Sequence, residues 1–86
     1  MIVSNMVVSI DFCGMQRVVT QKNSINMPLL EKTRVADALE FVRNRYPDLH
    51  LDVEMVLITV NQKAASLDRV LQANDTVSFF PPIAGG

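Results

Sequence analysis

The stretch RVADALEFVRNRY, residues 34–46, decides the fold of this 86-residue chain. One helical face is apolar, because the residues at the i, i+3, i+4 and i+7 spacing are Val35, Ala38, Leu39, Val42 and Tyr46. The opposite face carries Asp37, Glu40, Arg43 and Asn44. Thr33 is the predicted N-cap, and Pro47 ends the run because it disfavours helical geometry at the residue before it. The stretch therefore predicts one amphipathic helix of about three turns.

Two predicted strands precede this helix. Residues 6–12 alternate with the period of a half-buried strand, and their apolar members are Met6, Val8, Ile10 and Phe12. A second strand is predicted from the alternation of Ile25, Met27 and Leu29. It should be an edge strand, because Pro28 has no N–H to donate. Gly14 suggests a turn, and residues 13–23 are predicted to form the loop of this hairpin.

Three more predicted strands follow the helix, at about residues 55–60, 64–66 and 76–80. The first two are joined by a predicted turn at Asn61, Gln62 and Lys63, and an irregular connector at residues 67–74 leads to the last strand. The order is β-β-α-β-β-β. It predicts an α+β fold, in which a mixed four- to five-stranded sheet packs on one main helix.

Length and composition limit the class of protein. A chain of 86 residues that is 49% hydrophobic should form one packed domain, expected over residues 1–80, followed by a flexible tail over residues 81–86. Eight basic and nine acidic side chains leave a net charge of −1, which gives no electrostatic reason to expect nucleic acid or a membrane as partner. The lone Cys13 indicates a reducing compartment, and residues 1–12 lack the order of a signal peptide. A cytoplasmic location is therefore expected.

The usual catalytic constellations are missing from the sequence. His50 is the only histidine, and a loop or surface imidazole is expected there. Cys13 is expected to be an inert, partly buried thiol, because no activating base can be named for it. The acidic residues are scattered as on a solvated surface. The three glycines, Gly14, Gly85 and Gly86, form no phosphate loop, so neither a metal nor a bound cofactor is predicted.

The ending FFPPIAGG, residues 79–86, is the most informative segment. A frayed chain end is one interpretation, but it leaves the aromatic and apolar residues before the glycines unexplained. The two prolines hold the chain extended, and residues 81–86 can reach about 20 Å at about 3.3 Å per residue. Gly85 and Gly86 have no side chains, so the terminal carboxylate can enter a narrow tunnel in another protein. We therefore predict a substrate protein that carries its own functional group.

This ending, with NDTVS at residues 74–78 before it, closely resembles the end of the MoaD-type sulfur carriers. These are the small subunits of molybdopterin synthase, in the ubiquitin-like MoaD/ThiS family. Looser matches are TRVADALEFV at residues 33–42 and VNQ at residues 60–62. The family pattern often has glycine in place of Asn74, and it does not require the residues before Met6. The resemblance implies a β-grasp, or ubiquitin-like, fold with the first and last strands paired in the centre of the sheet.

The resemblance also implies a chemistry. An ATP-dependent adenylating enzyme of the ubiquitin-activating type would activate Gly86, and a sulfur donor protein would supply the sulfur for a terminal thiocarboxylate. The large subunit of molybdopterin synthase would then receive the tail and use the sulfur to build the dithiolene of molybdopterin. Gly85 would give the slim approach, and the segment that contacts the partners would be Phe80, Pro81, Pro82, Ile83 and Ala84. No cofactor would be bound by the chain itself, because the partner enzyme uses the ATP.

Three alternatives share features with this hypothesis. The same tail chemistry would serve a carrier for another pathway, such as thiamine thiazole or a tungsten cofactor. A ubiquitin-like modifier would instead join Gly86 to lysines of target proteins. In a plain interaction domain the tail would be incidental.

The last strand gives one more prediction about this tail. Phe79 and Phe80 are adjacent, so their side chains must point to opposite faces of the sheet. Ser78 shares a face with Phe80 and marks that face as the wetter one. Phe79 is therefore predicted in the core, and Phe80 is predicted to be largely exposed and to act as a docking anchor.

Overall fold

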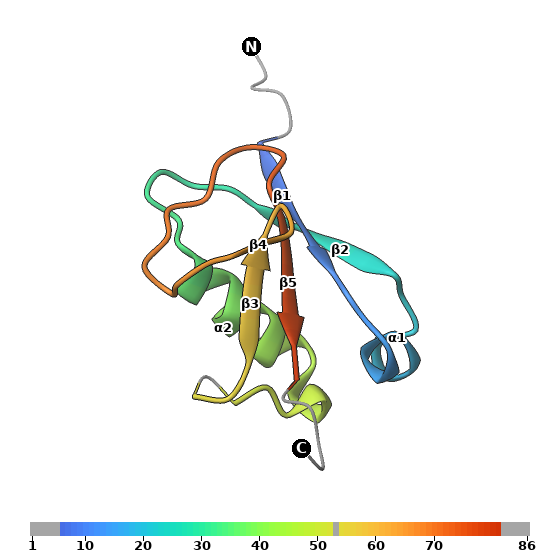
Figure 1. Ribbon diagram of the computed structural model, residues 1–86. Helices are drawn as coiled ribbons and strands as arrows, with labels where there is room; N and C mark the ends of the chain where they lie inside the picture. Colours follow the sequence, from blue (N-terminus) through green and yellow to red (C-terminus); the bar gives the residue numbers. More distant parts are fainter. Residues whose placement is uncertain (1–5, 53, 82–86) are drawn as a thin grey trace.

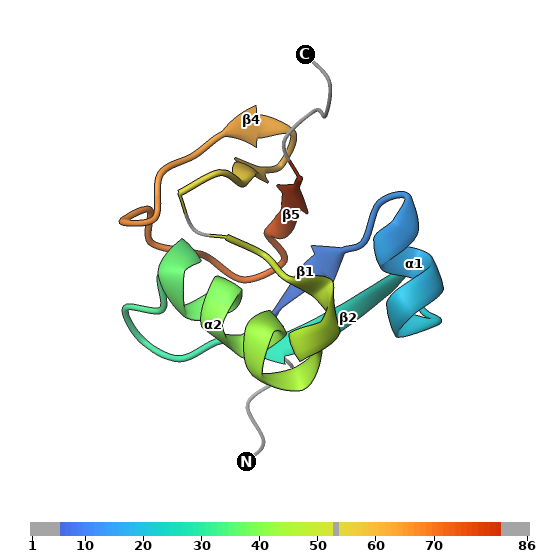
Figure 2. The same ribbon diagram turned by 90° about the horizontal axis from the view of Figure 1, so that it is seen from below.

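The computed structural model describes residues 6–52 and 54–81. Its elements are β1 (Val7–Asp11), α1 (Met15–Thr20), β2 (Ser24–Pro28), α2 (Val35–Arg45), the 3₁₀ helix η1 (Pro47–Leu49), β3 (Leu57–Val60), β4 (Lys63–Ala64) and β5 (Thr76–Phe80). Figures 1 and 2 show α2 against one face of the sheet, while α1 and η1 lie at the end of the molecule toward which β5 runs. Within the described residues, no helix has the length and apolar character needed to cross a bilayer.

The strands form one mixed sheet in the order β2-β1-β5-β3-β4. The central strands β1 and β5 are parallel, with Ile10 opposite Val77, and each other neighbouring pair is antiparallel. Strand β2 lies at an edge and ends at Pro28, as the missing N–H of proline predicts. This is the β-grasp arrangement, so the predicted fold class is confirmed.

The core lies between α2 and the sheet. The predicted apolar face of α2 is buried, and its buried members are Val35, Ala38, Leu39 and Val42. The sheet contributes buried side chains from β1, β3 and β5, among them Val8, Ile10, Val60, Val77 and Phe79. Each such side chain stabilises the fold by about 1.5–3 kcal/mol through its removal from water. At the end of α2, the half-buried Tyr46 ring meets the Phe12 ring edge-on, with 5.6 Å between their centroids.

The predicted loop at residues 13–23 is wrong, because part of it forms helix α1. The buried side chains of α1 are the polar Gln16 and Thr20, whereas its exposed side chains include the apolar Met15, Val18 and Val19. This is the reverse of an amphipathic core helix, so the apolar pattern contained no helix signal. Gly14 precedes α1 with a φ of 54°, a conformation that glycine adopts without strain.

The predicted N-cap of α2 is also wrong by one residue, since Arg34 rather than Thr33 occupies that position. The Thr33 hydroxyl instead closes the turn before the helix, donating to the carbonyl of Leu30 at 2.8 Å and accepting from its N–H at 3.0 Å. The first turn of α2 is capped by Asp37, whose carboxylate accepts from the backbone N–H of Arg34 at 2.9 Å. A carboxylate is also favoured there by the helix dipole.

Strands β3 and β4 form a hairpin that is shorter than predicted. Strand β3 begins at Leu57 rather than residue 55, and Lys63 belongs to β4 rather than to the turn. The turn consists of Asn61 and Gln62, whose φ angles are 52° and 71°. Positive φ at both residues is what a type I′ hairpin turn requires, and asparagine tolerates it better than most side chains.

Candidate functional site

The candidate site is the end of β5, where the predicted tail begins. Phe79 is 2% exposed and lies in the core, whereas Phe80 on the opposite face is 36% exposed. The predicted facing of the two rings is confirmed, although the exposure of Phe80 is partial. Leu57 of β3 pairs with Phe80 across the sheet and is 57% exposed. Two accessible apolar side chains therefore lie together beside the start of the tail.

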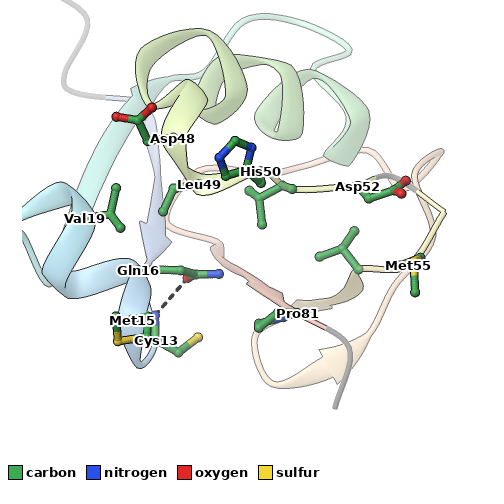
Figure 3. Close-up of a pocket in the computed structure, with 12 residues that line it drawn as sticks. Cys13, Met15, Gln16, Val19, Asp48, Leu49, His50, Asp52, Met55 and Pro81 are labelled. Carbon is green, nitrogen blue, oxygen red and sulfur yellow. Dashed lines mark hydrogen bonds between the residues drawn. The ribbon is translucent and has the colours of Figure 1, made fainter. Parts of the chain in front are cut away.

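Two hollows flank this strand end. The first, of about 600 Å³, lies on the open face of the sheet, where Phe80 meets polar side chains of β1, β3 and β5 such as Asp11, Thr59 and Ser78. The second, of about 400 Å³, lies between α1 and the segment around η1, and Pro81 lines it (Figure 3). Its apolar walls come from Met15, Val19, Leu49, Leu51, Met55 and Val56. The chain thus leaves β5 between a polar hollow and an apolar one.

The titratable side chains that line the second hollow are Cys13, Asp48, His50 and Asp52. Burial raises the pKa of the Cys13 thiol, an effect that Arg17 opposes and Asp11 reinforces. A raised pKa lowers the thiolate fraction at neutral pH, so Cys13 is a weak nucleophile, as predicted. His50 is exposed, which agrees with the predicted surface imidazole. Across residues 6–52 and 54–81, no group of three His, Cys, Asp or Glu side chains is placed to hold a metal ion.

A buried glutamine connects α1 to the end of β5. Gln16 Nε2 donates to the carbonyl of Phe79 at 2.6 Å, and Gln16 Oε1 accepts from the backbone N–H of Cys13 at 3.0 Å. The parallel pairing of β1 with β5 ends at Asp11 and Ser78. The Phe79 carbonyl lies one residue beyond that pair, and Gln16 is its hydrogen-bond donor there. Sequence reasoning missed Gln16, because a single polar residue in a short segment is typical of a loop.

A second polar network fixes the start of β5. The side-chain amide of Asn61 donates to Asp75 Oδ1 at 2.9 Å, while its oxygen accepts from the N–H of Thr76 at 2.9 Å. Asp75 Oδ2 accepts from the N–H of Gln72 at 2.8 Å. Asp75 is only 7% exposed, so the expectation that the acidic residues lie on a solvated surface is wrong at this position. The matching segments VNQ and NDTVS therefore hold the hairpin against β5.

Of the predicted site residues, the structure describes Phe80 and Pro81. The others lie outside the described residues, and they are Pro82, Ile83, Ala84, Gly85 and Gly86. Their roles in partner binding, adenylation and sulfur transfer stay predictions. The predicted flexibility of residues 81–86 stays one as well.

Comparison with known proteins adds independent information. The ThiS family pattern matches residues 12–86. A molybdopterin synthase sulfur carrier subunit of Dictyostelium discoideum is 31% identical over 64 residues, which cover 72% of this chain and 73% of that protein. The subunit of the same name from Mycobacterium tuberculosis is 37% identical over 54 residues, which cover 63% of this chain and 65% of that protein.

Solved structures show the same architecture. A Pyrococcus furiosus protein assigned as molybdopterin converting factor subunit 1 superposes with a TM-score of 0.77 at 26% identity, covering 91% of this chain and 99% of that one. SAMP1 from Haloferax volcanii, a small archaeal modifier protein, gives 0.79 at 22% identity over 93% and 99% of the two chains. A complex of subunits 1 and 2 of molybdopterin-converting factor from Helicobacter pylori gives 0.60 at 21% identity over 94% and 100%. The last two likenesses concern the fold alone.

The family match and the fold agree with each other. The matched residues 12–86 include both helices and the last four of the five strands in chain order. The curated relatives carry the name of a sulfur carrier, and the β-grasp sheet is shared with the solved structures. This chain therefore belongs to the ThiS/MoaD family of ubiquitin-like sulfur carriers.

Proposed function

We propose that this protein is the sulfur carrier of molybdopterin synthesis and that the carboxylate of Gly86 is its reactive group. The family match carries the proposal, because it runs to residue 86 and so includes the two glycines. The shared name of the two curated relatives supports the same pathway. Burial raises the pKa of the Cys13 thiol, which makes Cys13 a weaker candidate than Gly86 for the reactive group.

The proposed reaction has three steps. In the adenylating enzyme, a carboxylate oxygen of Gly86 attacks the α-phosphorus of ATP and pyrophosphate leaves. A sulfur nucleophile at the oxidation state of sulfide, supplied through a donor protein, then displaces AMP and leaves a thiocarboxylate. In the large subunit of molybdopterin synthase, the sulfur is transferred to a pyranopterin precursor, and water restores the carboxylate. Adenylation is required because a free carboxylate has no good leaving group.

In this proposal the folded body presents the tail. Phe79 fixes β5 in the core, and Pro81 cannot donate to a continued strand ladder, so the chain departs from the sheet there. Phe80 and Leu57 supply an apolar contact beside the departure point, of the kind that forms the centre of protein interfaces. The catalytic groups belong to the partner enzymes, which agrees with the raised pKa of the Cys13 thiol.

Conjugation to lysines of other proteins is the second candidate function. The fold likeness to a small archaeal modifier protein favours it. Both candidate functions begin with adenylation of a terminal glycine. The two functions differ in the nucleophile that displaces AMP. Sulfur gives a thiocarboxylate on the free carrier, whereas a lysine amine gives an isopeptide bond to a target.

Mass spectrometry of the intact protein tests the proposal. The chain is produced together with its own organism's adenylating enzyme, ATP and a sulfur donor, and the expected product has one oxygen replaced by sulfur at Gly86. The matched variants are deletion of Gly86 and addition of one alanine after it, each of which moves the carboxylate by about 3.5 Å. Both should fold normally and remain unloaded, because reacting atoms must be held within a narrow range of distance.

The outcomes separate the functions. Covalent adducts on lysines in place of the thiocarboxylate would establish the modifier function. Normal sulfur loading of either tail variant would contradict the assignment of Gly86 as the reactive residue.

A further inference from the structure

We propose that Gln16 is a positioning residue that sets the direction in which the tail leaves the folded body. The inference rests on the proposed function, since it concerns delivery of the Gly86 carboxylate to the adenylating enzyme. Gln16 is 7% exposed and lies on α1, a helix whose exposed residues are otherwise largely apolar. A buried amide in such a short helix calls for a role beyond filling space, because burying an amide without hydrogen bonds is costly.

Both ends of the Gln16 side chain are in use. The partner at one end is an N–H, that of Cys13, and the partner at the other end is a carbonyl, that of Phe79. A donor and an acceptor together dictate which amide atom faces which partner, so only one orientation satisfies both. The side chain therefore bridges the start of α1 and the last buried residue of β5 in a single geometry.

The helix that carries Gln16 is itself fixed. Arg17 Nε donates to the carbonyl of Phe12 at 2.9 Å. Phe12 is buried in the core, so α1 is tied to the body independently of β5. The amide of Gln16 thus holds the end of β5 from a fixed support.

The hydrogen bond from Gln16 to the Phe79 carbonyl lies close to the start of the tail. The Phe79 carbonyl lies two residues before Pro81. The proline ring restricts the φ angle of Pro81, so the chain has little freedom there to correct a changed direction of the strand end. Residues 82–86, when extended in a partner, span about 17 Å at about 3.3 Å each. A displaced strand end must be compensated by rotations within the tail before the carboxylate reaches the same position, which lowers the fraction of docked carrier that is in reactive geometry.

The test compares Gln16→Met with Thr20→Val in the full-length protein. Methionine fills the same space without either hydrogen bond. Valine at position 20 is the matched control, because Thr20 is equally buried in the same helix. Its hydroxyl bonds to the carbonyl of Gln16 and to the carbonyl and N–H of Lys22, all of which lie in or next to α1. Carrier-dependent exchange between ATP and labelled pyrophosphate is measured with the adenylating enzyme over a range of carrier concentrations.

The positioning role predicts a specific kinetic split. Gln16→Met should lower kcat at saturating carrier by about tenfold or more, because misplacement of a reacting group slows the chemical step. A purely structural loss lowers the concentration of folded carrier, which raises the apparent KM and leaves kcat unchanged; Thr20→Val should behave in this way. Gln16→Glu is the second variant, since it keeps the acceptor for Cys13 but places an oxygen against the Phe79 carbonyl. It should lower kcat as well.

The two proposals fail in different ways. A wild-type kcat for both Gln16 variants, with active wild-type carrier, would overturn the positioning role and leave the carrier function intact. Absence of exchange with wild-type carrier would refute the carrier function instead. In that case NMR tests the claim that Gln16 sets the direction of the tail. The backbone amide resonances of Phe80 and Ile83 should shift further from their wild-type positions in Gln16→Met than in Thr20→Val. Equal shifts in the two variants would overturn the claim.

Discussion

Truncation of Phe79 and of Phe80 to alanine should have opposite consequences for stability and binding. Phe79 is 2% exposed and faces the core below the sheet. A buried aromatic ring removes about 150–250 Å² from water, and its replacement also leaves a cavity. Phe79→Ala should therefore lower the free energy of unfolding by about 3–5 kcal/mol, a large share of the roughly 5–15 kcal/mol that a domain of this kind possesses.

Phe80→Ala should cost much less stability. The Phe80 ring is 36% exposed and lies over the open face of the sheet, where its removal creates no enclosed cavity. The loss then comprises part of the transfer energy and the cross-strand contact with Leu57, together about 1–2 kcal/mol. As a docking anchor, however, Phe80 should contribute about 2 kcal/mol or more to partner binding, which corresponds to roughly thirtyfold in Kd.

Urea unfolding and calorimetric titration with the adenylating enzyme measure the two effects. The difference in stability between the variants should be about 1–4 kcal/mol, with equal denaturant slopes if both unfold in one step. Leu30→Ala is the control for a general loss of apolar surface, because Leu30 is 74% exposed and follows the end of β2, at the opposite end of the sheet from the end of β5. If Phe80→Ala unfolds the protein as readily as Phe79→Ala, or binds the enzyme with wild-type affinity, the assignment of Phe80 as an exposed anchor is refuted.

Three further predictions concern the described residues around β5 and α1. Asn61→Ala should lower the free energy of unfolding by about 2 kcal/mol, because it removes both side-chain hydrogen bonds at the start of β5; Gln62→Ala, in the same turn, should change it by less than about 0.5 kcal/mol in urea unfolding. Gly14→Ala should cost about 1–3 kcal/mol in the same assay from its positive φ alone, since an added Cβ meets no atom within 4 Å. Native Cys13 should react with iodoacetamide more slowly than the unfolded chain at pH 8, because folding raises the pKa of its thiol. Since the folded state then retains the thiol proton to higher pH than the unfolded state, the free energy of unfolding should decline as the pH rises above about 8.5. Equal alkylation rates in the folded and unfolded chain would contradict this.

The fold was predictable wherever apolar residues repeat with a period. The alternation along β1 and β5 and the helical spacing in α2 identify the buried faces, and the structure buries most of those residues. Met6 is an exception, because it lies before the start of β1 and is 48% exposed. Helix α1 was not predictable in this way, because its buried residues are Gln16 and Thr20. The N-cap of α2 was misplaced for a related reason, since the Thr33 hydroxyl bonds within the preceding turn and is no longer free for the helix.

The candidate site was predictable only in part. Alternation along a strand is enough to place Phe79 inside and Phe80 outside, because it depends on neighbouring residues alone. The contact of Gln16 with Phe79 joins residues 63 positions apart, and the contact of Asn61 with Asp75 joins residues 14 positions apart. A single hydrogen bond at such separation leaves no periodic trace in the chain, so three-dimensional structure is needed to find it.

These polar contacts meet at one strand, and its place in the sheet explains why. Strand β5 has β1 and β3 as neighbours on its two sides and α2 against its apolar face. Its start is held by the network of Asn61 and Asp75, and its end is held by Gln16. An edge strand would have unpaired backbone groups and would fray at its end, whereas a central strand with bonded ends offers a fixed point at Phe80. A carrier whose reactive group is the C-terminal carboxylate depends on such a fixed strand end. Each residue that becomes mobile before the tail widens the range of positions that the carboxylate can occupy.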